Sequence, residues 1–207
     1  QYVAHIARML ELSGVPAAEA AKQAKSVLAF ETRLASKSKS SVEMSRDVKL
    51  FYNPVTPAEA DALTPNFKWT TFFESQGIPA PEKFSLAIPE FHKEFSAMLG
   101  DTPVADWQSY LRYHLVDGAA PYLGDEFVRE NFDFYGNKLR GQKELKERGK
   151  RVLDTINNQV GETLGQLYVQ VAFPAESKAR METLVENLSE ALKVRIENLD
   201  WMSDETK

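Results

Sequence analysis

Three histidines, His5, His92 and His114, are the side chains of this sequence best suited to bind a metal ion or to move protons at neutral pH. A zinc hydrolase site commonly pairs two histidines one helical turn apart, with a glutamate between them, in the pattern H-E-x-x-H. No two histidines are close in this sequence, and the pattern does not occur. His114 and Asp117 could share a metal on one helix face, although a histidine among aromatic residues more often packs and forms hydrogen bonds. We therefore predict no metal ligand on this chain.

Paired carboxylates, which could supply general acid–base chemistry, occur at Glu59 with Asp61 and at Asp125 with Glu126. Both pairs stand where helices are expected to begin, and acidic side chains there stabilise the helix N-terminus without any catalytic role. Serine is plentiful, but no G-x-S-x-G nucleophile motif occurs. Neither glycine-rich pattern that cradles phosphates, G-x-x-x-x-G-K-[ST] or G-x-G-x-x-G, is present. The sequence thus predicts no catalytic and no cofactor-binding residue.

Three further stretches could bind a ligand, but each has a simpler structural explanation. Trp69, Phe72 and Phe73 could line a pocket, yet aromatic residues at helical spacing usually pack in a core. The polar run Lys37–Ser41 could bind an anion, although a solvated loop is the favoured interpretation. His92 is followed by two charged residues, which indicates a surface position.

Composition limits the classes of function. The chain has 207 residues, which allows one domain or two small ones with room for a core. A net charge of −5 argues against a nucleic-acid partner and against a polybasic membrane anchor. The absence of cysteine excludes disulfides and thiolate metal sites. No apolar run approaches the roughly 20 residues of a membrane span.

Helical periodicity dominates the chain, and about eight or nine helices are expected. The clearest of them cover residues 2–12, 17–36, 89–99, 104–119, 124–135, 143–159 and 176–198, and a shorter one covers Pro57–Leu63. Phe84–Ile88 alternates with period two and is the only good strand candidate. No repeat period and no long interior linker is seen. We expect a mainly α, multi-helical single domain over residues 1–207, with at most a short strand pair near Phe84–Ile88.

The stretch Val160–Lys178 is the longest apolar part of this pattern. One helical face carries Leu164, Leu167, Tyr168, Val171 and Ala172. Gly161 and Gly165 lie on the same helix, and glycine costs about 1 kcal/mol against alanine there, so close approach of a neighbouring helix is the expected reason for them. We predict a central buried helix that ends before Pro174 and is followed by a second long helix.

Both ends have the character of cuts within a longer polypeptide. Helical periodicity begins at Tyr2 without a preceding capping residue, and there is no initiator methionine. At the other end, Ser203 followed by Asp204 and Glu205 has the pattern of an N-cap and an acidic first helical turn. We expect that the chain is a fragment of a longer protein.

Several segments together resemble the neprilysin-like M13 zinc metallopeptidases. The most specific are Leu164–Val169 with Phe173 and Glu176–Lys178 beyond it, and then Leu199–Lys207. Weaker matches, in the family's order and spacing, are Leu50–Thr56, the pair Phe67 and Trp69, Pro89–Glu90 and Phe134–Gly136. No single motif is decisive, but the order and spacing of all of them are specific.

The resemblance implies a parent protein with two mainly helical lobes around an internal cavity. The catalytic lobe of this family carries the zinc ligands, and this chain resembles the other lobe, which covers the active site and limits substrates to short peptides. We therefore expect no zinc and no catalysis in this fragment, zinc in the parent protein, and the catalytic lobe of the same chain and peptide substrates as partners. Vertebrate members have a cysteine near Arg151, so its absence indicates a bacterial member. A periplasmic or secreted location is implied by the resemblance alone.

Two other interpretations of the sequence stay open. A stand-alone helical module could receive a partner helix in an exposed apolar groove. An unrecognised hydrolase is a weaker interpretation, because no nucleophile and base occur together. A lobe separated from its partner lobe exposes apolar surface. We therefore expect self-association of the isolated fragment.

Overall fold

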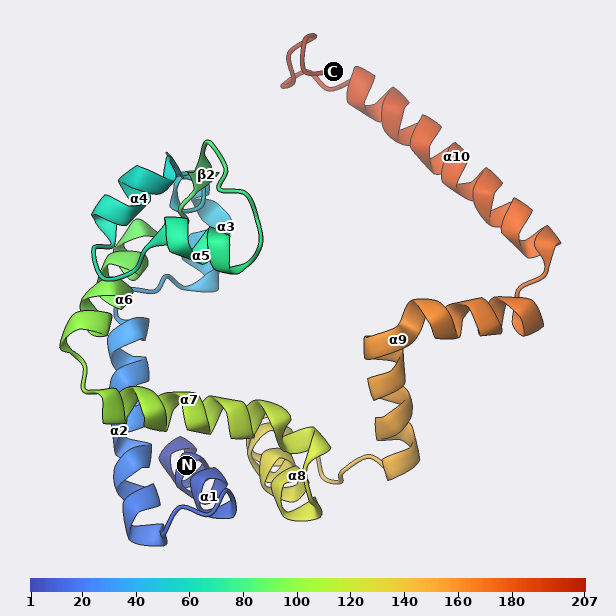
Figure 1. Ribbon diagram of the computed structural model, residues 1–207. Coiled ribbons are helices and arrows are strands. Elements are labelled where there is room, and N and C mark those ends of the chain that lie inside the picture. Colours follow the sequence, from blue (N-terminus) through green and yellow to red (C-terminus); the bar gives the residue numbers. More distant parts are fainter. The chain divides into compact units, whose positions relative to one another are not determined.

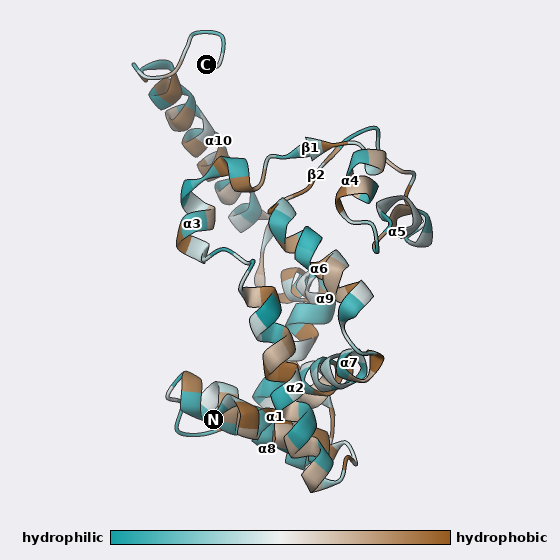
Figure 2. Cartoon of the chain, turned by 90° about the vertical axis from the view of Figure 1, so that its left-hand side faces the viewer, coloured by the Kyte–Doolittle hydropathy of each residue, from teal (hydrophilic) through white to brown (hydrophobic).

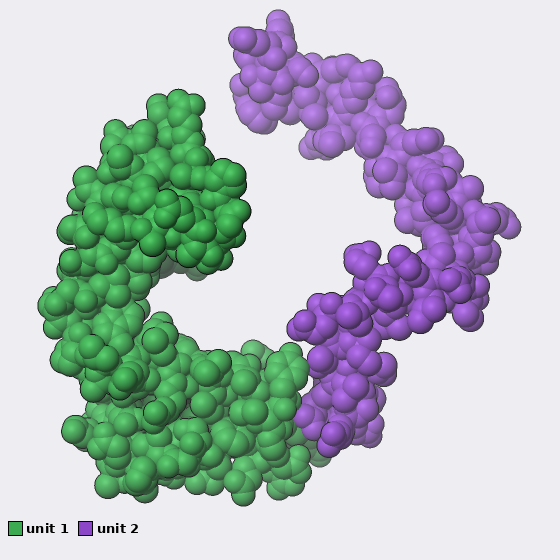
Figure 3. All heavy atoms as spheres, in the orientation of Figure 1, with its two compact units in different colours: residues 1–145 green, residues 146–207 purple.

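The computed structural model describes residues 1–207 and confirms the expected mainly α class (Figure 1). The residues form two compact units, residues 1–145 and residues 146–207 (Figure 3), and the single domain over residues 1–207 stays a prediction. None of the helices combines the length and the apolar character that crossing a membrane requires.

Eight α-helices build the first unit. They are α1 (Tyr2–Leu12), α2 (Ala17–Ala35), α3 (Ser41–Arg46), α4 (Pro57–Leu63), α5 (Trp69–Ser75), α6 (Pro89–Asp101), α7 (Val104–Ala119) and α8 (Asp125–Asn131). Three further helical segments belong to this unit: the 3-10 turns η1 (Val48–Leu50) and η2 (Ala120–Tyr122), and the π-helix η3 (Phe132–Leu139). The second unit contains α9 (Arg148–Ala172) and α10 (Ala175–Glu197).

A two-stranded antiparallel sheet is the only sheet. Strand β1 (Pro54–Val55) pairs with β2 (Phe84–Ser85), with Pro54 opposite Ser85 and Val55 opposite Phe84. The predicted strand at Phe84–Ile88 therefore forms over its first two residues. The partner strand β1 was not predicted, because two residues are too few to show an alternating pattern.

The main core of the first unit lies between α1, α2 and α7. Apolar residues of α1 pack against small residues of α2, and the buried ring of Tyr113 on α7 completes the cluster. The other members of this core are Ile6, Met9 and Leu10 from α1, Val15 between α1 and α2, Ala20, Ala24 and Val27 from α2, and Ala120 from η2. Alanine side chains allow close helix approach, so the alanine-rich pattern of α2 explains why α1 packs along it.

The segment after α7 packs back on this core. Helix α8 contacts both α1 and η2, and it continues directly into the π-helix η3. The sequence predicted one helix over residues 124–135, so the change of helix type at Phe132 is a finding of the structure. A Cβ atom at Gly136 would overlap the ring of Phe132, so the position of that ring in η3 requires a glycine there.

The second unit departs most from expectation. Helix α9 ends before Pro174 as predicted, and α10 begins at Ala175. Neither helix has a buried residue, so the prediction of a central buried helix over Val160–Lys178 is wrong for this chain. Gly161 and Gly165 have no atom within 4 Å of a built Cβ, so within this chain no neighbouring helix explains them. Val160 itself has non-helical angles, φ −135° and ψ 29°, and marks a kink within α9.

Candidate functional site

A buried cluster of titratable side chains surrounds His5, where α1, α7, α8 and η3 meet. His5 Nε2 lies 3.0 Å from Oδ1 of Asp117, and its Nδ1 lies 2.9 Å from Oε1 of Glu130. The His5 side chain is only 1% exposed. The hydroxyl of Tyr135 donates to Oδ2 of Asp117 at 2.7 Å, and the ring of Phe134 stacks on the imidazole. We call these five residues the His5 cluster.

The contacts of His5 determine its charge. A neutral imidazole has one N–H donor and one acceptor nitrogen, whereas both ring nitrogens of His5 face carboxylate oxygens. Burial by itself lowers the pKa of His5, but the hydrogen bonds to Asp117 and Glu130 outweigh it and raise the pKa above the ordinary 6.5. Burial raises the pKa of Asp117, and the hydrogen bonds from His5 and Tyr135 outweigh that effect and lower it. This geometry favours the protonated form of His5, with one carboxylate at each ring nitrogen.

This geometry does not fit a zinc site. The two carboxylates stand at opposite ring nitrogens of His5, so no single ion could reach all three side chains. Elsewhere in the chain, no three histidine, aspartate or glutamate side chains are grouped so that they could hold a metal ion.

His114 and Asp117, the pair for which a shared metal was considered, have different partners. His114 Nε2 lies 2.9 Å from Oε1 of Glu31, on α2, and its side chain is 44% exposed. The same oxygen of Glu31 accepts a hydrogen bond from the hydroxyl of Tyr2 at 2.8 Å. Asp117 points instead into the His5 cluster. The two residues thus belong to two separate polar contacts, each of which ties α7 to another helix.

The carboxylates that were considered as candidates for acid–base chemistry lie at helix ends. Glu59 and Thr56 form a reciprocal capping box at the start of α4, as predicted. Asp61 accepts a hydrogen bond from the backbone N–H of Trp69 at 2.6 Å and so caps α5, which is the next helix and not its own. Asp125 stands in the first turn of α8. These contacts occupy the oxygens in structural roles.

The polar run Lys37–Ser41 also ends in a helix cap. The hydroxyl of Ser40 accepts from the backbone N–H of Glu43 at 3.2 Å, and the Glu43 carboxylate accepts from the backbone N–H of Ser40 at 3.0 Å. Residues 37–41 are all exposed, which agrees with the predicted solvated loop.

The aromatic residues of α5 pack in a group of rings of which none is fully buried, so the predicted core position is only partly realised. The ring of Trp69 lies 5.2 Å from that of Phe84 and 5.1 Å from that of Phe67. His92 joins this group, with its ring 5.3 Å from Trp69. It is half-buried, and burial lowers its pKa, so the predicted surface position of His92 is wrong. Charged neighbours in sequence did not reveal this, because successive helical residues face different directions.

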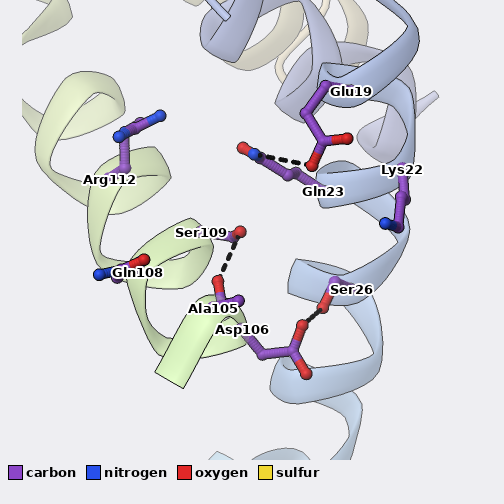
Figure 4. A pocket seen from close by; sticks show the side chains of 9 residues that line it. All are labelled: Glu19, Lys22, Gln23, Ser26, Ala105, Asp106, Gln108, Ser109 and Arg112. Atoms are coloured by element: carbon purple, nitrogen blue, oxygen red, sulfur yellow. Dashed lines mark hydrogen bonds between the residues drawn. The ribbon is translucent and has the colours of Figure 1, made fainter. Parts of the chain in front are cut away.

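A small pocket lies between α2 and α7 (Figure 4). Its polar side chains largely bind one another: Gln23 donates to Glu19 at 3.2 Å, and Ser26 donates to the carboxylate of Asp106. Lys22 and Arg112 add two positive charges to these two carboxylates. Since the charges balance and the acceptors are partly occupied, the pocket favours no particular class of ligand.

Many apolar side chains of the second unit are exposed. We call this set of side chains the apolar face of the second unit. On α9 it includes Val152, Leu153, Val160, Leu167, Tyr168, Val169 and Val171, and on α10 it includes Met181, Leu184, Val185, Leu188 and Leu192. Val171 is 90% exposed and Leu188 is 61% exposed. Apolar residues recur along α10 as brown bands in Figure 2. Much of this face was predicted as one apolar side of a helix, but it was expected to lie in a core.

Comparison with known proteins gives one family over the whole chain. The model of peptidase family M13 matches residues 1–207. Endothelin-converting enzyme-like 1 of Rattus norvegicus is 30% identical over 210 residues, which is 100% of this chain and 27% of that protein. Neutral endopeptidase of Lactobacillus helveticus is 25% identical over 199 residues, covering 96% of this chain and 30% of that protein. The chain thus spans about a quarter to a third of the length of these relatives.

Solved structures with the same fold come from two bacteria. The zinc metalloprotease Zmp1 of Mycobacterium tuberculosis, in complex with an inhibitor, is 35% identical with a TM-score of 0.81, covering 99% of this chain and 31% of that one. PepO from Lactobacillus rhamnosis is 22% identical with a TM-score of 0.76, covering 98% of this chain and 32% of that one, and shows the fold alone.

Proposed function

The chain belongs to peptidase family M13, and on that premise we propose that it is the non-catalytic helical lobe of a zinc metalloendopeptidase that hydrolyses short peptides. In this proposal the lobe encloses the active-site chamber and limits the size of substrates. Zinc and its ligands lie in the remainder of the parent polypeptide. The zinc metalloproteases among the similar structures support the parent activity. The poor fit of His5, His92 and His114 to a zinc site supports the division between the lobes.

The apolar face of the second unit is the observation that carries the proposal. Contiguous apolar surface is uncommon on monomeric proteins and marks a site of contact. Full burial of one valine or leucine side chain contributes about 1.5–3 kcal/mol, so a face of this extent favours a partner strongly. The relatives are much longer than this chain, and their additional residues are the simplest source of that partner. We infer that the catalytic lobe of the same polypeptide covers this face.

A stand-alone helical module would use the same face to receive a partner helix. The match to one peptidase family over all 207 residues favours the lobe over the module. The parent reading frame distinguishes them, because an H-E-x-x-H motif downstream of Lys207 belongs only to the peptidase. A stop codon soon after Lys207 would favour the module.

Zinc content and peptide cleavage test the proposed division of labour. The 207-residue chain and the full-length protein are purified in parallel, and zinc is measured by elemental analysis. We expect stoichiometric zinc and chelator-sensitive cleavage of a short peptide in the full-length protein, and neither in the 207-residue chain. Zinc bound stoichiometrically to the 207-residue chain, or cleavage by it that a chelator blocks, would overturn the proposal. The size limit is tested by the full-length protein's rates on short peptides and on a folded protein.

We also propose a bacterial origin with a periplasmic or secreted location. The lack of cysteine and the two bacterial neighbours of the same fold support this origin. Fractionation of the source cells, followed by detection with an antibody to the 207-residue chain, tests the location. Detection only in the cytoplasmic fraction would contradict it.

A further inference from the structure

We propose that His5 is a pH-dependent lock, which in its protonated form holds α8 and the π-helix η3 to the core made by α1, α2 and α7. The lock has one cation on α1 between a carboxylate on α7 and a carboxylate on α8. The η3 residues Phe134 and Tyr135 contact the same imidazole and its partner Asp117. A single protonation site on α1 thus contacts α7, α8 and η3, with Asp117 and Glu130 lying 112 and 125 positions later in the sequence.

Loss of the His5 proton would remove one of the two hydrogen bonds that the ring makes to Asp117 and Glu130. The neutral ring has a single N–H, so it could donate to Asp117 or to Glu130 but not to both. The other nitrogen would then direct its lone pair at a carboxylate oxygen about 3 Å away. Because the His5 ring is buried, water cannot replace the missing hydrogen bond without an opening of the packed elements. Glu130 is the partner at the outer side, since its side chain is 20% exposed and that of Asp117 is 13% exposed.

Other charged and titratable groups around the ring do not replace this role. The groups that face the cluster are Tyr2 on α1, Glu31 on α2, Tyr113 and Asp117 on α7, Glu130 on α8, and Tyr135 and Lys138 on η3. Burial raises the pKa values of Tyr2, Tyr113 and Tyr135, so these hydroxyls stay neutral through the range in which histidine titrates. The pKa of Lys138 is raised chiefly by its hydrogen bond to Asp133, so it stays positive.

The π-helix is the element that the lock controls. A helix with i→i+5 hydrogen bonds is rare, and η3 keeps it over eight residues. Its inner side is held by the stacking of Phe134 on His5 and by the hydrogen bond from Tyr135 to Asp117. Residues 140–147 follow η3 and lead into the second unit. Release of the lock therefore loosens the segment through which the first unit continues into the second.

Nuclear magnetic resonance of the histidine rings tests the protonation state. The chain has three histidines, so His92→Gln and His114→Gln variants assign the ¹⁵N signals of His5. We expect His5 to titrate above pH 6.5, with both ring nitrogens protonated on the acid side of its midpoint. Glu130→Gln should lower the midpoint of this titration, whereas Glu126→Gln, an exposed change on the same helix, should leave it in place. Titration of His5 below 6.5 would overturn the proposal.

Hydrogen exchange tests the consequence for the fold. Amide protection of residues 125–139, corrected for intrinsic exchange and compared with that of residues 17–35, should fall as the pH passes through the His5 titration. Each unit by which the pKa of His5 exceeds 6.5 corresponds to about a tenfold loss of protection. His5→Gln should remove the pH dependence, and His114→Gln should retain it. If residues 125–139 of His5→Gln lost amide protection over the same pH range as the unmodified chain, the proposed lock would be refuted. If His5→Gln does not fold, the pair Glu130→Gln and Glu126→Gln decides the outcome.

Discussion

The ring of Phe134 lies flat against the imidazole of His5, with ring centroids 4.4 Å apart and planes inclined by 10°. Both residues are buried, at 5% and 2% exposure. The face of an aromatic ring attracts a cation, so this contact stabilises the charged form of His5 in addition to filling the core. His5 and Phe134 are 129 positions apart in the sequence, so this contact also joins α1 to the π-helix η3.

Removal of the Phe134 ring should destabilise the first unit markedly. Phe134→Ala leaves a cavity and removes the stacking partner of His5, and we expect a loss of about 3–5 kcal/mol in the free energy of unfolding. Urea denaturation followed by circular dichroism measures it. Phe72→Ala is the matched control, because Phe72 is 39% exposed and should cost clearly less. Equal losses of unfolding free energy in the two variants would show that the stacking of Phe134 on His5 does not contribute more than an ordinary packing contact.

Stability should depend on pH through His5. Its pKa is raised in the folded state, so its contribution is present in full below pH 6.5 and is lost as the pH rises through the folded pKa. The pKa of Asp117 is lowered from 3.8, so its contribution is present above that value and is lost as the pH falls through the lowered pKa. The difference in unfolding free energy between wild type and His5→Gln, measured from about pH 5 to about pH 9, should therefore shrink as pH rises. A difference that grows with pH would contradict the assigned charge.

Gly136 should tolerate no side chain. The Cβ of Gly136→Ala would stand 2.4 Å from the ring of Phe132, so either the ring or the π-helix must move, and we expect lower stability. Gly118→Ala is the control: it lies in α7 with nothing within 4 Å of a built Cβ, and it should stabilise the protein by about 0.5–1 kcal/mol. Thermal unfolding of the two variants measures the contrast. Stabilisation by Gly136→Ala would show that η3 has no need of a glycine.

Gly165→Ala should have opposite effects in two forms of the protein. In the 207-residue chain no atom lies within 4 Å of the built Cβ, so alanine should stabilise α9 by about 1 kcal/mol. In the full-length protein we expect a loss of stability, because our proposal places another helix against this face. Unfolding of both forms, with and without the substitution, measures the difference. Equal stabilisation in both forms would argue against close helix packing at Gly165.

The isolated 207-residue chain should associate with itself through the apolar face of the second unit. Leu188→Lys places a charge within that face and should shift the chain toward monomer. Ala179→Lys adds the same charge at an exposed position on the opposite side of α10 and should leave association unchanged. Light scattering coupled to size-exclusion chromatography gives the mass. A monomer of the unmodified chain at high concentration would contradict this prediction.

Local signals in the sequence were sufficient to predict most helices and several of their ends. Residues 104–119 were predicted as a helix and form α7 with the same bounds, because a proline before the helix and a regular apolar stripe act within one segment. Thr56, Pro57 and Glu59 likewise predicted the start of α4, since a capping box involves residues only three apart. Motif order and spacing over the chain led to the M13 family, and the family model confirms it.

Contacts between distant segments could not be predicted in this way. His5, Asp117 and Glu130 are 112 and 125 positions apart, and nothing in one sequence indicates that α1, α7 and α8 meet. The change from α-helix to π-helix at Phe132 also depends on the partners of Phe134 and Tyr135, which the fold supplies.

The sequence by itself determined that the chain is mainly helical and to which peptidase family it belongs, because periodicity, caps and motif spacing are local properties of the chain. Tertiary structure alone decided which side chains became charged partners in the core and which apolar stripe remained exposed. The stripe of Leu167, Val171 and Leu188 has the same pattern whether a neighbour covers it or not. Burial is a property of the packed assembly, and periodicity predicts only which face a helix would bury.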